Sequence, residues 1–215
     1  MNLIGDKMLG QKEANKKVRA TTEPLRAVVF LGQMENDGIR TNLRAALTDK
    51  LSAKGWELDI IDLAEARLTN CIGCFECWVK TPGQCRFGDF GRELAGKVIH
   101  SDLFLIVSRI RFGSYSSDVQ RAWERMLPLL SPLFEKVDGE THHVHRYDRY
   151  PSIAALGVLD GADGKSEEIF RKRVKRNSIN IFSPSCSVTI VGSQETSGQV
   201  EKAVGNLIAG IEVAA

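Results

Sequence analysis

Four of the five cysteines lie within fifteen residues, where they could act together. Cys71, Cys74, Cys77 and Cys85 have the spacing C-x2-C-x2-C-x7-C, and Cys186 stands far from them in the sequence. An odd number of cysteines, with no signal-peptide pattern at the start, argues against a disulfide framework. It favours a reducing, cytoplasmic compartment, where clustered thiols bind a metal or carry out redox chemistry.

Three uses of this cysteine cluster are open. Four thiolates can hold a [4Fe–4S] cluster, and a turn at Pro82-Gly83 would bring Cys85 back to the other three. The same thiolates could bind Zn²⁺ tetrahedrally, although zinc sites more often pair two C-x2-C knuckles across a longer span. Without a metal, the first three cysteines would pack as small apolar residues on one face of a short helix.

A polar loop, Gly32–Thr41, follows the first apolar segment of the chain and leads into an amphipathic one. Backbone N–H groups and the helix dipole at such a point favour an anion such as phosphate. Arg40 and Thr41 would add a charge and a hydroxyl, whereas Glu35 and Asp37 would repel a dianion. No G-x-G-x-x-G or G-x-x-x-x-G-K-[ST] sequence is present, which disfavours a Rossmann dinucleotide site and a P-loop. The alternative is an ordinary polar turn.

Short apolar segments and amphipathic segments alternate along the chain and must position these residues. The apolar runs predict five strands buried on both faces, at Arg26–Leu31, Trp56–Asp62, Leu103–Ser108, Ile153–Leu159 and Ser187–Val191. The 3.6-residue periodicity predicts helices at Asn42–Lys54, Asp89–His100, Ser117–Leu130, near Ser166–Arg176 and near Glu195–Ile211, with a capping box of Ser117 and Gln120. This alternation predicts an α/β three-layer sandwich with a five-stranded parallel sheet in the order 2-1-3-4-5. Ligands of such sheets bind beyond the carboxyl ends of the strands, here at the loops after the first and third strands.

Size and composition predict one globular domain. The chain has 215 residues, of which 43% are hydrophobic and 26% charged, and this excludes a wholly disordered or fibrous protein. Residues 1–25 are polar and rich in lysine, and we expect them to form a mobile arm before a single domain at 26–215. The net charge of +2 lies in this arm, so the body is neutral, which disfavours nucleic acid as a partner. No apolar run approaches the roughly 20 residues of a membrane helix, so no membrane partner is expected.

The segment Cys71–Cys85, CIGCFECWVKTPGQC, resembles the cysteine motif of iron–sulfur flavoproteins, which are relatives of the NADPH-dependent FMN reductase-like proteins. The similarity continues in SRIRFGSYSSDVQRAWERMLPLLSP and GETHHVHRYDRYPSI and covers about Arg26 to Ile211. It implies a flavodoxin-like fold, FMN, and a [4Fe–4S] cluster on the four cysteines. It also implies NAD(P)H or a ferredoxin-type protein as electron donor, and a homodimer or homotetramer with the flavin near the subunit interface.

The resemblance places the flavin at the loops after the first and third strands. The residues expected to bind it are Gly32, Gln33, Arg40, Thr41, Asn42, Arg109, Ile110, Arg111, Phe112, Gly113, Ser114 and Tyr115, with Asp160–Gly164 flanking the ring. Where the family reads Gly-Ser-Pro-Arg after the first strand, this chain has Gly32-Gln33-Met34-Glu35, without the phosphate-binding Ser and Arg. We hypothesise that Arg109 and Arg111 supply the positive charge that the first loop has lost.

These expectations converge on an FMN-dependent NAD(P)H oxidoreductase of the iron–sulfur flavoprotein type. Two alternatives are a non-enzymatic electron carrier with FMN and a [4Fe–4S] cluster, and a flavodoxin-like scaffold that has lost flavin. No Ser–His–Asp or paired-carboxylate arrangement indicates a hydrolase. His142, His143 and His145 fall in a long connection, which we expect to be a solvated loop with subunit contacts.

Overall fold

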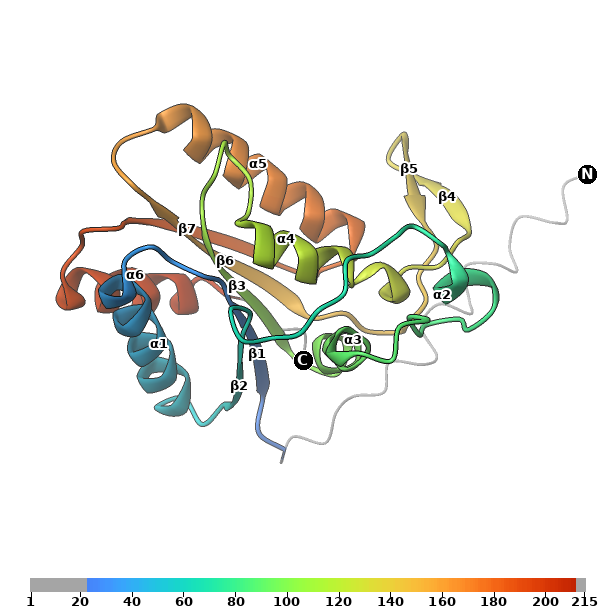
Figure 1. Ribbon diagram of the computed structural model, residues 1–215, viewed down its shortest axis with the longest axis horizontal. Helices are drawn as coiled ribbons and strands as arrows, with labels where there is room; N and C mark the ends of the chain where they lie inside the picture. The colour runs from blue at the N-terminus through green and yellow to red at the C-terminus, as the bar shows by residue number, and fades with distance from the viewer. Residues whose placement is uncertain (1–22, 212–215) are drawn as a thin grey trace, which may run out of the picture.

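A five-stranded parallel sheet forms the centre of the protein (Figure 1). The computed structural model describes residues 23–211, so most of the arm expected at 1–25 lies outside the described residues. The strands are β1 (Arg26–Leu31), β2 (Glu57–Asp62), β3 (Leu103–Arg109), β6 (Ser152–Leu159) and β7 (Cys186–Gly192), in the order β2-β1-β3-β6-β7. The predicted α/β class and strand order are confirmed.

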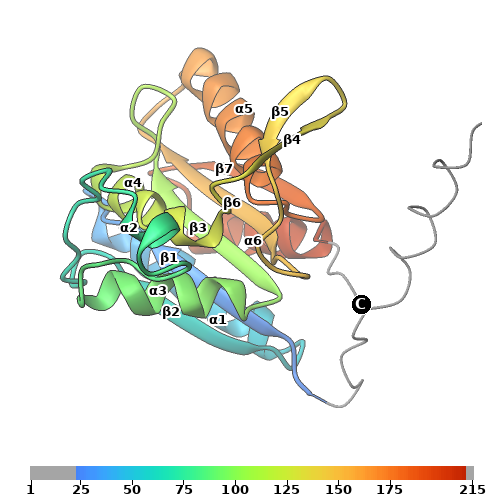
Figure 2. The same cartoon turned by 90° about the vertical axis from the view of Figure 1, so that its right-hand side faces the viewer.

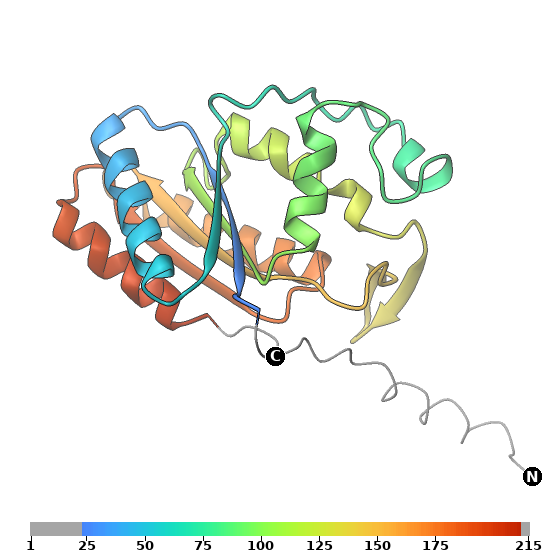
Figure 3. The same cartoon turned by 90° about the horizontal axis from the view of Figure 1, so that it is seen from below.

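Helices cover both faces of this sheet and complete the expected three layers. They are α1 (Asp37–Ser52), α2 (Glu76–Val79), α3 (Phe90–Ile99), α4 (Ser117–Glu124), α5 (Gly164–Asn180) and α6 (Ser197–Ala209). Side chains of α1 and α6 form one core with one face of the sheet, and those of α3, α4 and α5 form a second core with the other. Figure 3 shows α1 and α6 together on one side and α3 and α4 on the other. Every residue of β3 except the last is buried, as expected of a central parallel strand.

The third predicted helix is shorter than its sequence pattern indicates. α4 ends at Glu124, and a 3-10 turn at Leu127–Leu129 follows it. Pro128 lies in this turn and has no backbone N–H to continue an α-helix. The predicted capping box is wrong, because the N-cap of α4 is Ser116, whose side chain makes no capping hydrogen bond. A capping box is present instead at Thr196, the N-cap of α6.

The long connection before β6, predicted to be a loop, contains a β-hairpin. Its strands are β4 (Phe134–Val137) and β5 (Glu140–His143), which pair with each other apart from the main sheet. Asp138 and Gly139 join them with φ values of 51° and 83°, the left-handed backbone that a tight two-residue hairpin turn requires. Figure 2 shows the hairpin projecting from the body.

The histidines of this connection pack against aromatic rings. The ring centroid of His143 lies 5.4 Å from that of Trp78 and 4.5 Å from that of Phe134. The His145 ring lies 3.8 Å from the Phe182 ring. The connection is therefore ordered by ring packing that reaches both α2 and the end of α5. In the part of the chain that the structure describes, no helix is long and apolar enough to cross a membrane.

Candidate functional site

A cavity of about 870 Å³ opens at the carboxyl edge of the sheet, where the fold predicts a ligand. Its walls are the loop between β1 and α1, including Gln33, Met34 and Glu35, and the segment from Arg109 to Gln120 after β3. A space of this size lies within the range of cofactor and small-molecule sites. The two loops that the sequence singled out therefore do meet around one cavity.

Charged side chains from three loops form a connected network in this cavity. The Oε1 atom of Glu35 contacts Nη1 of Arg109 and lies 2.9 Å from Nη2 of Arg111. The other guanidinium nitrogen of Arg109 pairs with Asp160, which follows β6. A hydrogen bond from Arg109, with the charges of both arginines, holds the pKa of Glu35 below its usual value. Glu35 is therefore ionised at neutral pH and balances the two arginines.

The first loop offers fewer free amides than its sequence predicts. The Gln33 N–H donates to Oδ2 of Asp118 at 2.6 Å. Asn36 is the N-cap of α1, and its side-chain oxygen accepts from the Gly38 N–H at 2.9 Å. The side-chain oxygens of Asp118 and Asn36 thus already accept hydrogen bonds from two backbone amides that a phosphate would need. Sequence reasoning missed the contribution of Asp118.

Three predicted ligands on α1 do not line the cavity. Arg40 forms an ion pair with Asp62 at the end of β2. Thr41 and Asn42 lie in the first two turns of the helix and are also absent from the cavity wall. The Arg40 charge and the Thr41 hydroxyl, which were expected at the start of α1, therefore do not line this cavity.

The loop after β3 has a defined shape. Ile110 is buried, and the Arg111 N–H donates to the Ser114 oxygen at 3.0 Å. Between them Phe112 is 95% exposed with a φ of 50°, at the tip of the loop. Gly113 also has positive φ, and a Cβ there would lie 2.5 Å from Ile169 of α5. The loop is therefore held close to α5 while it presents Phe112 to solvent beside the cavity.

Tyr115 anchors the far end of this loop. Its ring is buried, and its hydroxyl accepts a hydrogen bond from the Asn177 side chain at 3.1 Å. Burial raises the pKa of Tyr115 to about 12, so the phenol stays protonated at neutral pH. Together with the buried Ile110, this residue fixes the loop that carries Arg109 and Arg111.

The residues of the cavity fit a phosphorylated flavin, with a shift in the predicted phosphate position. The Glu35 carboxylate marks a place where two guanidinium groups hold an anion. Charge-assisted pairs of this kind are the usual means by which arginine binds phosphate. In the first loop, the amides of Gln33 and Gly38 already have side-chain partners. Arg109 and Arg111 are the cationic side chains at the cavity wall, and their binding of a phosphate stays a prediction.

The four clustered cysteines line one small pocket, of about 20 Å³, beside α2. Cys77 is buried, Cys71 and Cys85 are half-buried, and Cys74 is exposed. Burial, and to a smaller extent the neighbouring cysteines, raise the pKa of the Cys77 thiol to about 11. The segment therefore gathers four thiols around one space, and Cys77 is a neutral thiol in this state.

These thiols do not enclose a single ion. Among residues 23–211, no three histidine, cysteine, aspartate or glutamate side chains come close enough together to hold a metal ion. A zinc ion needs each sulfur at about 2.3 Å, so the loop would have to contract around it. A cluster of several irons holds its thiolates farther apart, but the pocket has room for about one water molecule and would have to open. The four thiols are the type of ligand that a [4Fe–4S] cluster needs. Their present spacing, however, does not form a site for such a cluster.

A buried arginine that sequence reasoning missed holds the cysteine segment to the body. Arg125, directly after α4, is 1% exposed and makes a bidentate ion pair with Asp89, the N-cap of α3. It also donates to the backbone oxygen of Thr69, two residues before the first cysteine, at 2.7 Å. Arg92 donates to the Cys85 oxygen at 2.8 Å. Both ends of the cysteine segment are thus tied to α3 and α4 by guanidinium groups.

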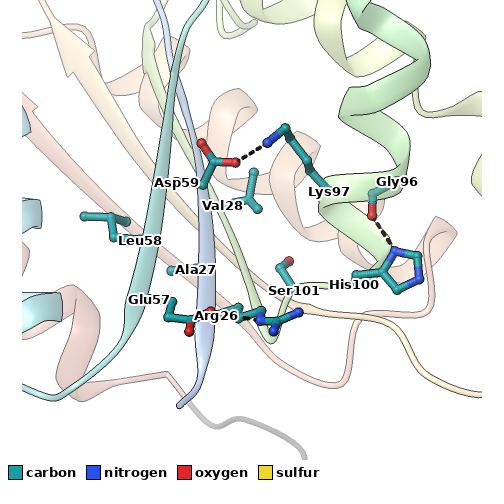
Figure 4. Close-up of a pocket in the computed structure, with 10 residues that line it drawn as sticks. All are labelled: Arg26, Ala27, Val28, Glu57, Leu58, Asp59, Gly96, Lys97, His100 and Ser101. Carbon is teal, nitrogen blue, oxygen red and sulfur yellow. Dashed lines mark hydrogen bonds and ion pairs between the residues drawn. The ribbon is translucent and has the colours of Figure 1, made fainter. Parts of the chain in front are cut away.

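A second hollow, of about 490 Å³, lies at the opposite edge of the sheet (Figure 4). It is formed by the amino ends of β1 and β2 and by α3. Ion pairs cross it, from Lys97 to Asp59 at 2.7 Å and from Arg26 to Glu57 at 3.0 Å. Because ligands of open α/β sheets bind at the carboxyl ends of the strands, this hollow is not the primary candidate site.

Comparison with known proteins shows which family and which solved structures this chain is similar to. The sequence profile described as NADPH-dependent FMN reductase matches residues 25–142. An iron-sulfur flavoprotein of Methanocaldococcus jannaschii is 28% identical over 105 residues, which are 49% of this chain and 53% of that protein. The match therefore spans about half the length of this curated relative.

Three solved structures with a similar fold are reductases or oxidoreductases by name. A putative quinone reductase from Klebsiella pneumoniae has a TM-score of 0.66 at 10% identity, covering 86% of this chain and 84% of that one. An NAD(P)H:quinone oxidoreductase from Methanothermobacter marburgensis has a TM-score of 0.62 at 11% identity, covering 86% and 96%. An FMN-dependent NADH-azoreductase from Bacillus anthracis in complex with FMN has a TM-score of 0.56 at 8% identity, covering 84% and 94%. At these identities the likeness concerns the fold alone.

Proposed function

The chain belongs to the NADPH-dependent FMN reductase family, and we propose that it is an FMN-dependent NAD(P)H oxidoreductase of the iron–sulfur flavoprotein type. The observation that carries this proposal is the cavity of about 870 Å³ at the carboxyl edge, with two arginines that hold an anion in it. The name of the curated relative and the FMN complex among the similar structures support the choice of cofactor and of chemistry.

The residues of the cavity would bind and orient the cofactor. Arg109 and Arg111 would hold the phosphate group, because they are the cationic side chains at the cavity wall. The loop after β3, fixed by the buried Ile110 and Tyr115, would lie against the flavin, with Phe112 available to exclude water. When bound, FMN supplies the hydride and electron chemistry, and the protein supplies position and electrostatics. We therefore assign no catalytic acid, base or nucleophile.

The four cysteines would hold a [4Fe–4S] cluster as a second redox centre. Support comes from the shared pocket of Cys71, Cys74, Cys77 and Cys85 and from the name of the relative in M. jannaschii. The contacts of Arg125 with the Thr69 oxygen and of Arg92 with the Cys85 oxygen hold the two ends of this segment. NAD(P)H or a ferredoxin-type protein as donor, and a homodimer or homotetramer, belong to the same proposal.

A second candidate function is electron transfer to a protein partner without an NAD(P)H reaction. It is favoured by the apolar side chains that the cysteine segment exposes, with Ile72 61%, Phe75 48% and Val79 72% exposed. Apolar groups of this kind beside a redox centre are typical of a surface that contacts another protein. The two candidates share both cofactors and differ in whether NAD(P)H reduces the flavin.

One set of measurements on anaerobically purified protein tests these proposals. An absorption spectrum shows bound flavin, and iron and zinc analysis identifies what the cysteines hold. Stopped-flow mixing with NADPH then separates the candidates, because fast bleaching of the flavin supports the reductase and no bleaching supports the carrier. A colourless, metal-free protein with no affinity for added FMN would contradict both, and would favour the scaffold that has lost flavin.

A further inference from the structure

The carboxylate of Glu35 contacts the guanidinium groups of both Arg109 and Arg111 in the carboxyl-edge cavity. We infer that this carboxylate holds the place of the ligand's phosphate group in the free protein, and that it leaves the two arginines when a phosphorylated flavin binds. The inference rests on the proposed function, because it takes FMN as the ligand. It goes beyond that function because it assigns Glu35 as a side chain that competes with the phosphate of FMN for the two arginines and so sets the affinity for FMN.

The contacts of Glu35 support this role. One oxygen atom, Oε1, meets both Arg109 and Arg111, as an oxygen of a bound phosphate would. The Nε atom of Arg109 is buried and has no hydrogen-bond partner. Arg109 is also paired with Asp160 through its second terminal nitrogen, so its guanidinium keeps its place when Glu35 moves away. The two arginines thus form a site whose present anion belongs to the chain itself.

The carboxylate is held weakly enough to exchange. The Glu35 side chain is 67% exposed, and it lies on a loop between β1 and α1. Water screens the pair with Arg111, whose side chain is 54% exposed, more than the pair with Arg109, whose side chain is 11% exposed. A phosphate group carries a charge of about −1.5 to −2 at neutral pH and several acceptor oxygens, so it would compete well for both guanidinium groups.

The neighbouring acidic residue Asp37 offers a matched control. Like Glu35, it lies at the cavity wall, and it is the first residue of α1. The arginine pairs described for the cavity involve Glu35 and Asp160 and not Asp37. The variant Asp37→Asn removes one negative charge from the cavity wall without releasing either arginine.

Flavin binding to the variants Glu35→Gln and Asp37→Asn tests the inference. Dissociation constants for FMN and for riboflavin, which lacks the phosphate, are measured by flavin fluorescence on flavin-free protein. We expect E35Q to bind FMN about tenfold more tightly than wild type, which corresponds to about 1.4 kcal/mol, and riboflavin within about twofold. The affinity of D37N for FMN should rise less than about threefold. Adding Arg111→Gln to E35Q should remove most of the rise in FMN affinity.

A second measurement uses inorganic phosphate and does not depend on flavin. In a phosphate-free buffer, added phosphate should raise the melting temperature of E35Q more than that of wild type or D37N, because ligands that bind the folded state stabilise it. If E35Q shows this phosphate effect but neither protein binds FMN, the competition by Glu35 stands and the proposed function fails. Equal gains for FMN and riboflavin, or no gain of E35Q over D37N with FMN and with phosphate, would overturn the inference.

Discussion

The buried ion pair between Arg125 and Asp89 determines how firmly the cysteine segment is attached. The Arg125 guanidinium donates to the two carboxylate oxygens of Asp89 at 2.6 and 2.8 Å and to the Thr69 oxygen at 2.7 Å. Asp89 also accepts from the Thr69 N–H at 2.7 Å. The pair thus joins the start of α3, the end of α4 and the residues before the first cysteine.

Removing either partner should destabilise the protein, and by different amounts. Taking one member from a buried ion pair costs about 3–5 kcal/mol, because the other charge is left without compensation. We expect Arg125→Met to cost about 3 kcal/mol, at the low end, because Asp89 is 20% exposed and keeps its Thr69 hydrogen bond. Asp89→Asn should cost about 5 kcal/mol, because it leaves a guanidinium that is 1% exposed without a counter-charge.

Urea denaturation at pH 7, followed by far-ultraviolet circular dichroism, measures both costs from the midpoint and the slope. A pH series adds a second readout. Hydrogen bonds from Arg125 hold the pKa of Asp89 well below its usual range. This contribution to stability is therefore complete above the unfolded pKa of about 3.9 and is lost as the pH falls through the folded pKa. R125M should lose less stability than wild type over this acidic range.

The exposed pair of Arg176 and Glu140 provides the control, since both side chains are about half exposed, at 53% and 50%. Arg176→Met should change the free energy of unfolding by less than about 1 kcal/mol. If R125M lowered the free energy of unfolding no more than this control, burial would not strengthen the ion pair of Arg125 and Asp89. The reasoning would then be refuted. A larger loss of stability in R125M than in D89N would refute the argument that the less exposed charge is the more costly one to leave without a partner.

Two further predictions concern the same region. Gly91→Ala should lower the free energy of unfolding by about 1–3 kcal/mol, because its Cβ would lie 2.5 Å from Cζ of Arg125. Gly96→Ala in the same helix has open space and should instead raise it by up to about 1 kcal/mol, measured by the same denaturation. In metal-free protein at pH 8, Cys77 should be alkylated most slowly of the four clustered cysteines, since its pKa is raised to about 11, and the exposed Cys74 fastest. Equal rates by peptide mass spectrometry would contradict the burial of Cys77.

The sheet could be predicted from the sequence because its strands are continuous apolar runs. The predicted bounds of Leu103–Ser108 and Ile153–Leu159 differ from β3 and β6 by one residue at one end. The hairpin was missed although Asp138-Gly139 is a typical hairpin turn. Its strands have no buried face, so the alternation that indicates a strand is absent.

The candidate site was only partly predictable, because its partners are far apart in the sequence. The two loops and the arginines were identified, but Glu35 and Arg111 are 76 positions apart, and no periodicity pairs them. Arg125 was missed for a related reason. A helix continued to Leu130 would place Arg125 off the apolar stripe, toward solvent. Because α4 ends at Glu124, the chain turns and directs this side chain inward.

The projecting hairpin of β4 and β5 offers a place for a reporter group. Its turn is exposed, and insertions are best tolerated at such tips. The aromatic contacts of His143 connect the hairpin to Trp78, beside the cysteines. A fluorophore attached at the turn would therefore lie outside the core and still report, through the contact of His143 with Trp78, on movement of the cysteine segment.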